Sequence, residues 1–256
     1  MKWTERLKIT RISRWAILLL TIAIIIFTLV TLYGLNVGNF VIGVENKNDR
    51  GDVTLALSVS GDPMSSLPRL SAQGLREQGD TTKAHIPDLD VITKGSGSKN
   101  DTLDQTYMAF SFFLHNKSAI AVDYEYTFKI EKADNDIFEV LRVWIIESNE
   151  EDIVTDDTVY MYNETPENWA KYEEEMDRLT QYDAYGNIIK DYRYDAELFI
   201  NETDVCRVES TNFRPGGKRK YTVVLWAEGC DPKCTTDYKL IDETLRASML
   251  FVGRAA

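Results

Sequence analysis

Histidine is scarce in this sequence, and the familiar catalytic motifs are missing from it. The chain has 256 residues but just two histidines, His85 and His115. It lacks H-E-x-x-H, G-x-S-x-G, the P-loop and the dinucleotide-binding glycine pattern, which are the usual sequence signals of zinc hydrolases, serine hydrolases, nucleotidases and dehydrogenases. We therefore predict a protein that is not an enzyme, with no catalytic residue, no resident metal ion and no cofactor.

Positive charge is also in short supply. Lysine and arginine number 29 against 41 aspartates and glutamates, for a formal net charge of −12. Residues 1–14 carry a net charge of +4, which leaves −16 on the rest of the chain. Nucleic acids and anionic lipid headgroups attract basic protein surfaces, so this balance argues against both as partners.

Charge is absent altogether from Trp15 to Val44. Within this run, residues 15–35 are long enough to cross the ~30 Å hydrocarbon core as a helix, so they predict a transmembrane segment. The basic tail, residues 1–14, predicts a cytoplasmic amino terminus by the positive-inside rule. Residues 36–256 would then lie outside the cytoplasmic membrane. The alternative is a cleaved signal peptide, but the run exceeds the usual h-region and no A-x-A-like site follows it.

Period-two alternation dominates residues 36–256 and predicts β-strands. In "VDYEYTFKI" (residues 122–130) apolar or aromatic side chains alternate with polar ones, as in a half-buried strand. Further candidates are "VTLALSVS", "YMAFSFFL", "FEVLRVWII", "TVYMY", "YTVVLWAE" and "LRASMLF". Alternation predicts that Phe112, Tyr124, Phe128 and Trp226 point inward. We expect a mainly β domain, an antiparallel β-sandwich of jelly-roll type.

Two stretches interrupt the strand pattern. Residues 61–102 are rich in Gly, Ser, Pro and Asp, which predicts a long surface loop. Residues 166–182 predict an inserted amphipathic helix, because Thr165 can cap it and Pro166 fits its first turn. The following "DAYGN" predicts a hairpin turn, with Gly186 and Asn187 able to adopt positive φ.

Charged residues are clustered in three short runs. "ESNEEDIVTDD" (residues 147–157) holds six carboxylates in eleven residues, and "ADND" (residues 133–136) offers three oxygen-bearing side chains. Neither run has the spacing of a calcium-binding loop, so solvated hairpin tips explain them better than weak calcium binding. The basic trio Lys218, Arg219 and Lys220 precedes a strand, as charges that protect a sheet edge do.

The chain contains three cysteines, Cys206, Cys230 and Cys234. Cys230 and Cys234 are four positions apart in "WAEGCDPKC", which is neither the C-x-x-C of a redox motif nor a full set of zinc ligands. On the oxidising side of a membrane thiols tend to pair. We predict a Cys230–Cys234 disulfide; pairing of Cys206 with one of the two is the main alternative.

The same turn resembles that of a group of anchored or secreted proteins of Gram-positive, clostridia-like bacteria. Their sandwich domain closes with the turn W-x-E-G-x-D-P-x-C, matched here by Trp226, Glu228, Gly229, Asp231, Pro232 and Cys234. The group is distantly similar to the TasA/camelysin family of exported jelly-roll subunits of matrix fibres. The resemblance covers residues 39–251 and implies an extracytoplasmic sandwich.

The leading hypothesis is a single-pass protein of the cytoplasmic membrane whose acidic domain interacts with other surface proteins, copies of itself or the envelope. A subunit fixed in the membrane cannot travel into a filament, which favours display over fibre formation. One alternative is a cleaved, secreted fibre subunit that assembles by strand addition. A second is a metal-dependent hydrolase, which the resemblance to camelysin suggests.

Overall fold

The computed structural model describes most of the chain from residue 40 onward. The described residues are 20–21, 40–47, 52–72, 81–99, 106–133, 137–162, 170, 173–174, 177–178, 180–182, 184–186, 188–190, 195–231, 233–234 and 245–256. The chain divides into two compact units, Met1–Gly38 and Asn39–Ala256.

The basic tail and the predicted membrane segment lie outside the described residues, except for Leu20 and Thr21, which are helical. Among the residues that the structure describes, no helix has both the length and the apolar character needed to cross a bilayer. Anchoring by residues 15–35 therefore stays a prediction.

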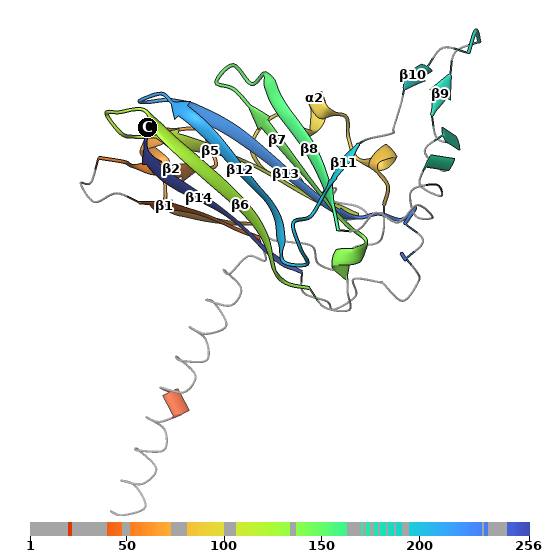
Figure 1. Cartoon of the computed structure of the whole chain (residues 1–256), viewed down its shortest axis with the longest axis horizontal. Coiled ribbons are helices and arrows are strands. Elements are labelled where there is room, and N and C mark those ends of the chain that lie inside the picture. Colours follow the sequence, from red (N-terminus) through yellow and green to blue (C-terminus); the bar gives the residue numbers. More distant parts are fainter. Residues whose placement is uncertain are drawn as a thin grey trace, which may run out of the picture. The chain divides into compact units, whose positions relative to one another are not determined.

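The unit Asn39–Ala256 is mainly β, as its alternation predicted, and it contains two large sheets (Figure 1). The five-stranded sheet has the order β12-β6-β14-β1-β3. Its strands are β1 (Phe40–Asn46), β3 (Arg69–Ala72), β6 (Val122–Lys132), β12 (Asp204–Phe213) and β14 (Arg246–Ala255).

The seven-stranded sheet has the order β11-β8-β7-β13-β5-β2, and β4 also pairs with β5. Its strands are β2 (Leu55–Ser58), β4 (Gly97–Ser98), β5 (Tyr107–Asn116), β7 (Leu141–Ser148), β8 (Val154–Met161), β11 (Ala196–Leu198) and β13 (Lys218–Ala227).

Both sheets are mixed, so the prediction of a purely antiparallel arrangement is wrong. β1 pairs with β14 in parallel, and β11 pairs with β8 in parallel. Parallel neighbours need a long connection between them. The chain between β1 and β14 contains nearly the whole domain, a relation that the alternation of single strands does not reveal.

The inner faces of the two sheets pack against each other to form the main core. Phe112 of β5 lies edge-on to Phe251 of β14 at 6.0 Å, and Tyr126 of β6 lies edge-on to Tyr221 of β13 at 5.6 Å between ring centroids. The predicted alternation of β6 is confirmed, since every even-numbered residue from 122 to 130 is buried. Phe112, Tyr124 and Phe128 all belong to this core, as predicted.

A second, smaller core lies on the outer face of the seven-stranded sheet. It contains Trp144, Val224 and Trp226 from the sheet and Ile86 and Ile92 from the segment 81–99. This corrects the inward assignment of Trp226, which is fully buried but on the opposite face from Tyr221. The error arose because β13 is apolar on both faces, so alternation alone does not say which face is inward.

The region predicted as a long loop, residues 61–102, contains several short elements that complete the domain. Among its described residues, the elements are η1 (Pro63–Ser65), β3, η2 (Lys83–His85), α2 (Leu89–Ile92) and β4. β3 extends the five-stranded sheet beside β1. η2 and α2 lie over the outer face of the seven-stranded sheet and supply the cover of the second core.

The predicted helix at residues 166–182 lies mostly outside the described residues. Those of its residues that are described between 170 and 178 are helical. Its predicted end is wrong, because Gln181–Tyr182 form β9, which pairs with β10 (Ile188–Lys190). Gly186 has a φ of 84°, as the hairpin prediction required. A further 3-10 turn, η3 (Ile137–Glu139), precedes β7.

Candidate functional site

The cysteine-containing turn folds back over the end of β13 through buried polar groups. Trp226 Nε1 donates a hydrogen bond to Glu228 Oε2 at 3.0 Å, and the backbone nitrogen of Cys230 donates to Glu228 Oε1 at 3.3 Å. Both Trp226 and Glu228 are fully buried. The glutamate therefore fixes the indole and the turn to each other.

Asp231 forms a buried ion pair with Arg142, the residue paired with Trp226 across the β7–β13 ladder. Arg142 Nη2 lies 3.0 Å from Asp231 Oδ2, and the two side chains are 4% and 1% exposed. Asp231 Oδ1 accepts a hydrogen bond from the backbone nitrogen of Lys233 at 2.9 Å. Charges this deeply buried are costly unless they are paired and hydrogen-bonded, as these are.

Backbone hydrogen bonds connect this turn to two other segments. The nitrogen of Glu228 donates to the carbonyl of Val140 at 2.9 Å, and the nitrogen of Gly229 donates to the carbonyl of Thr81 at 2.8 Å. The turn thus joins the start of the covering segment 81–99 to the start of β7. These contacts explain Trp226, Glu228 and Asp231 of the motif as structural residues, while Pro232 lies outside the described residues.

The structure holds no disulfide bond among the three cysteines, all of which are described. The Cys230–Cys234 bridge therefore stays a prediction. Cys206 lies in β12 and is buried in the main core. Burial raises the pKa of its thiol to about 12, although hydrogen bonds with Phe128 and Tyr160 act in the other direction. A thiol in this environment is a poor nucleophile.

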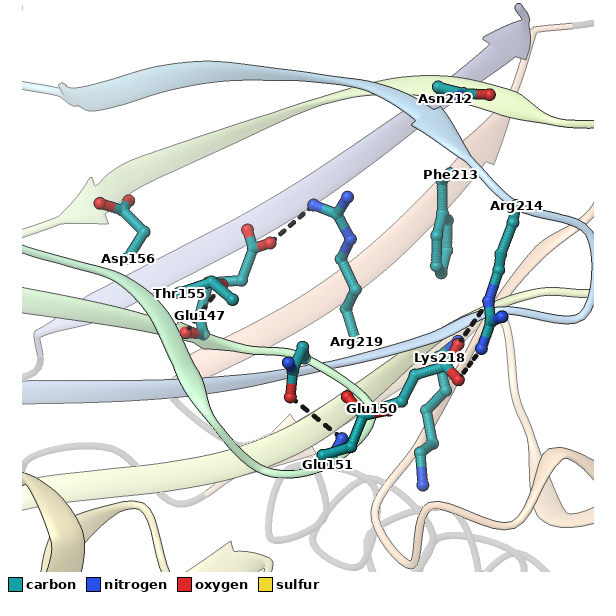
Figure 2. A pocket seen from close by; sticks show the side chains of 11 residues that line it. Glu147, Glu150, Glu151, Thr155, Asp156, Asn212, Phe213, Arg214, Lys218 and Arg219 are labelled. Carbon is teal, nitrogen blue, oxygen red and sulfur yellow. Dashed lines mark hydrogen bonds and ion pairs between the residues drawn. The ribbon is translucent and has the colours of Figure 1, made fainter.

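A cleft lined by side chains of both charges lies between β12 and the β7–β8 hairpin (Figure 2). Its volume is about 750 Å³. The hairpin contributes Glu147, Asn149, Glu150, Glu151, Thr155 and Asp156. The end of β12, the following turn and the start of β13 contribute Asn212, Phe213, Arg214, Lys218 and Arg219. We call this the charged cleft.

Glu147 and Arg219 of the cleft lining belong to a chain of hydrogen-bonded side chains that also includes Tyr124 and Tyr221. Arg219 Nη1 lies 2.6 Å from Glu147 Oε1 and 3.0 Å from Tyr124 Oη. Tyr221 Oη donates to Glu147 Oε2 at 2.9 Å and lies 2.6 Å from Tyr124 Oη. Burial raises the pKa of Tyr221 well above its ordinary value, so this hydroxyl keeps the proton that it donates.

The rim of the charged cleft is tied together by Glu150. Its carboxylate forms an ion pair with Arg214 and accepts a hydrogen bond from the backbone nitrogen of Lys218 at 3.0 Å. These hydrogen bonds hold the pKa of Glu150 below its usual value. Glu151 and Asp156 differ from Glu150, since no ion pair or hydrogen bond from the described residues reaches either carboxylate.

The charged cleft unites two runs that the sequence analysis treated separately. The acidic run forms the tip of the β7–β8 hairpin, as predicted, with Asn149 nitrogen bonded to Ile153 oxygen at 2.9 Å. The edge-protection hypothesis for the basic trio is wrong, because β13 lies between β7 and β5. Calcium binding is not supported by any metal-ligand cluster among the described residues, and residues 134–136 of "ADND" are not described.

Strand parity could have predicted Glu147 and Arg219. Glu147 shares its face of β7 with Val143 and Ile145, and Arg219 shares its face of β13 with Tyr221. A charge in register with inward-facing apolar residues points into the space between the sheets. The alternation of side chains along β7 and β13 does not predict that β12 lies nearby, and residues of β12 complete the site.

His115 is buried, although it lies near the end of β5. Its exposed fraction is 3%, and its Nε2 lies 2.8 Å from Ser58 Oγ. Burial first, and then the charges of Lys218 and Lys117, lower the pKa of His115. The neutral imidazole is thus the form that suits this site.

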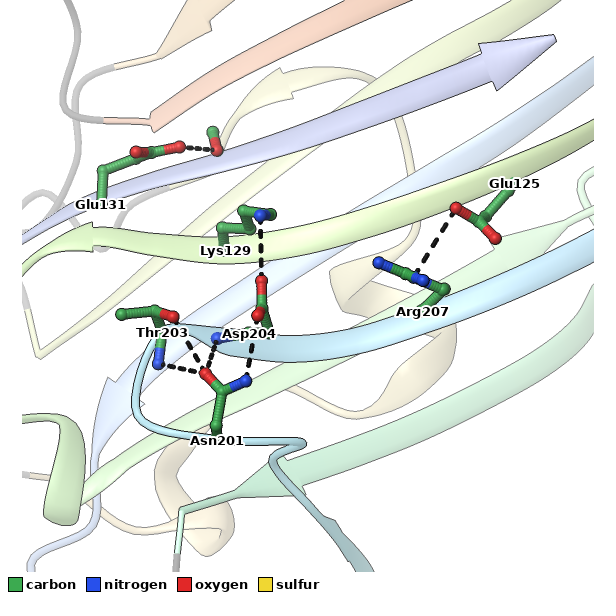
Figure 3. A network of polar contacts seen from close by, with 8 residues as sticks. Glu125, Lys129, Glu131, Asn201, Thr203, Asp204 and Arg207 are labelled. Atoms are coloured by element: carbon green, nitrogen blue, oxygen red, sulfur yellow. Dashed lines mark hydrogen bonds and ion pairs between the residues drawn. The ribbon is translucent and has the colours of Figure 1, made fainter.

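The outer face of the five-stranded sheet carries a different polar network (Figure 3). Lys129 pairs with Asp204 at 3.0 Å, and Arg207 approaches Glu125 at 3.6 Å. Asn201 Oδ1 accepts hydrogen bonds from the nitrogens of Thr203 and Asp204. The two ion pairs link β6 to β12, whereas the hydrogen bonds of Asn201 are local and stabilise the turn into β12.

Comparison with protein-family models and with curated protein sequences gave no match. The charged cleft is accordingly identified by its geometry. It combines a cavity of about 750 Å³ with charged side chains of both signs and one aromatic ring, that of Phe213, which suits it to bind a polar ligand.

Proposed function

We propose that this chain is a single-pass membrane protein that displays a jelly-roll-like β-sandwich outside the cytoplasmic membrane and binds surface or envelope components through the charged cleft. The cleft carries this proposal, because eleven residues from two distant parts of the chain line one cavity of about 750 Å³. The charge-free run of residues 15–44 supports the anchored topology. The role proposed is binding, without a reaction.

The resemblance to anchored sandwich proteins supports the same proposal. Trp226, Glu228 and Asp231 of the shared turn hold buried contacts that a sandwich needs to close this end. A jelly-roll assignment is supported by the two facing sheets, although the parallel pair β1–β14 departs from a purely antiparallel arrangement.

Protease added to intact protoplasts tests the topology. We expect digestion of residues 36–256 and protection of a short basic amino-terminal fragment. Survival of the whole chain would contradict the outward orientation. A Cys230–Cys234 peptide two hydrogens lighter without reductant would independently indicate an oxidising compartment.

Photo-crosslinking on intact cells tests the use of the cleft. A photoreactive residue at Thr155, which is exposed in the cleft lining, should capture a partner. The matched control is the same residue at Arg254 on the outer face of the five-stranded sheet, where the side chain is 57% exposed. Equal products from the two positions would contradict a binding role for the cleft.

A secreted subunit is the second candidate, favoured by one edge of the five-stranded sheet. β12 is ten residues long and pairs only with β6 among the described strands. An edge of this length is able to accept an added strand. Mass spectrometry of the mature amino terminus distinguishes the two candidates, because a subunit that is released has lost residues 15–35.

A further inference from the structure

Arg219 lines the charged cleft, and one edge of its guanidinium forms no hydrogen bond with a described residue. Its Nη1 makes all of its side-chain hydrogen bonds with described residues, to Glu147 at 2.6 Å, Ser210 at 2.8 Å and Tyr124 at 3.0 Å. Within the described part of the chain no hydrogen bond reaches its Nε or Nη2. These two nitrogens form the side edge of the guanidinium, whose spacing matches the two oxygens of a carboxylate.

The surroundings of Arg219 hold this edge in place. The guanidinium carbon lies 5.4 Å from the centroid of the Phe213 ring and 5.6 Å from that of Tyr124. Figure 2 shows the Arg219 side chain standing between Glu147 and Phe213. The side chain is still 26% exposed, so a ligand can reach it. A donor that is already ordered loses little conformational entropy on binding.

Glu151 and Asp156 favour a positively charged group on the ligand, whereas Arg219 favours a carboxylate. Both carboxylates line the cleft without an ion pair or hydrogen bond from the described residues, while Arg214 is committed to Glu150. A ligand with only negative charge would meet uncompensated repulsion from them. A ligand with only positive charge would leave the open edge of Arg219 unused. A ligand with both charges satisfies both sides of the cleft.

We propose that the charged cleft binds the carboxyl-terminal end of a basic peptide, or a free basic amino acid of the same chemistry. The α-carboxylate binds the Nε/Nη2 edge of Arg219, and the ammonium group of the ligand binds Glu151 and Asp156. The cavity of about 750 Å³ falls within the range of ~300–1,000 Å³ that is usual for small-ligand sites. This inference rests on the proposed binding role of the cleft and names its ligand class.

Calorimetry on the full chain in detergent micelles tests the proposal. The probes are the tripeptide Gly-Gly-Lys, its carboxyl-terminal amide, its Nε-acetyl form and free lysine. We expect the tripeptide to bind and the amide to bind about tenfold to a hundredfold more weakly, since a hydrogen-bonded charge is lost. Comparable binding of free lysine assigns the site to amino acids, whereas much weaker binding assigns it to peptide ends.

Variants locate the two halves of the site. In Arg219→Gln and Arg219→Lys, the preference for the tripeptide over its amide should disappear, because neither side chain has the paired edge. In the Glu151→Gln/Asp156→Asn variant, whose changes are at the exposed rim, the preference for lysine over acetyl-lysine should disappear instead. Arg254→Gln, on the outer face of the other sheet, should bind as the parent chain does.

The proposal is overturned if the amide binds as tightly as the acid, if the tripeptide does not bind at millimolar concentration, or if both preferences survive in the variants. A chain that crosslinks through Thr155 on cells but ignores the tripeptide would refute the ligand class alone. A chain that binds the tripeptide but gives no crosslink through Thr155 on cells would refute only the partner-binding part of the proposed function.

Discussion

The outer faces of the two sheets differ in burial: that of the five-stranded sheet is largely open to solvent, and that of the seven-stranded sheet is largely covered. On β6 of the five-stranded sheet, residues 123, 125 and 127 are half-buried and residues 129 and 131 are exposed. On β13 of the seven-stranded sheet, every residue from 220 to 227 is buried. The first face is polar and meets solvent, whereas the second buries Trp144, Val224 and Trp226 beneath the segment 81–99.

A few side chains of the segment 81–99 are enough to cover part of the outer face of the seven-stranded sheet. The covering segment places Ile86, Ile92 and the partly buried Leu89 on the outer core. Lys83 adds a cation–π contact, with its Nζ 3.4 Å from the centroid of the Trp144 ring. Three apolar side chains and one cation therefore allow two tryptophans to be placed on the outside of a sheet.

The largest expected effect separates the buried ion pair of the covered face from an ion pair on the bare face. Asp231→Ala leaves Arg142 buried without its partner, so we expect the free energy of unfolding to fall by about 3–5 kcal/mol. Glu209→Ala is the control, because Glu209 and Arg254 are both 57% exposed and 3.7 Å apart. Urea denaturation of both variants measures the difference, and a similar small loss in both would refute the structural role of the turn.

The second prediction tests the cover itself through two neighbours in α2. Ile92 is 2% exposed in the outer core, whereas Val91 is 56% exposed. We expect Ile92→Ala to cost about 2–4 kcal/mol by opening a cavity, and Val91→Ala to cost less than about 0.5 kcal/mol. If the two substitutions cost the same amount in thermal or urea unfolding, the segment 81–99 does not cover the sheet as described.

The third prediction concerns pH and the buried imidazole on the covered face. Burial and the charges of Lys218 and Lys117 lower the pKa of His115 below its ordinary 6.5, and the charge of Asp62 opposes them. The unfolded chain then binds this proton more readily than the folded chain, so stability is lost as the pH falls below 6.5 through the lowered value.

Substitution of His115 by Asn keeps a polar partner for Ser58 and removes this titration. We expect the urea midpoint of the parent chain to fall more steeply between pH 7 and pH 5 than that of His115→Asn. Parallel curves for the two proteins would mean that the imidazole does not resist protonation in the folded state.

The smallest expected effect lies on the bare face. Glu125 approaches Arg207 at 3.6 Å, with side chains 30% and 62% exposed, so Glu125→Ala should change stability by less than about 0.5 kcal/mol. Phe128→Ala, on the inner face of the same strand, is the positive control and should cost about 3–5 kcal/mol. If urea denaturation shows a large loss of unfolding free energy for Glu125→Ala, the outer face of β6 is not solvent-exposed as described.

The bare and covered faces also differ in how far they could be predicted from sequence. On β6 polar and apolar residues alternate, so the inward face was predicted correctly. On β13 "VVLWA" offers apolar side chains to both faces, and the sequence does not say which face meets the other sheet. The cover itself was missed because three scattered apolar residues in a Gly- and Ser-rich stretch give no periodic signal.

The candidate site was predictable only in part. The parity of Glu147 and Arg219 with their inward neighbours is visible in the sequence. Their meeting with Ser210 and Phe213 is not, since it depends on the pairing of β12 with β6 and on an irregularity between Ser210 and Phe213. Asn212, with a φ of 58°, forms that irregularity, and Asn tolerates this backbone region better than most residues do.

The parallel pairing of β1 with β14 has a consequence for how the domain is made. β14 lies between β6 and β1, so β1 and β3 have no ladder to the rest of their sheet until residues 246–255 are present. A chain that emerges amino end first from a ribosome or a translocation pore therefore cannot bury Phe40 and Ile42 against this sheet until its last strand has emerged. Sequence separations of this size slow folding. Any partner that binds β1 during this interval would compete with β14 for the same backbone hydrogen bonds.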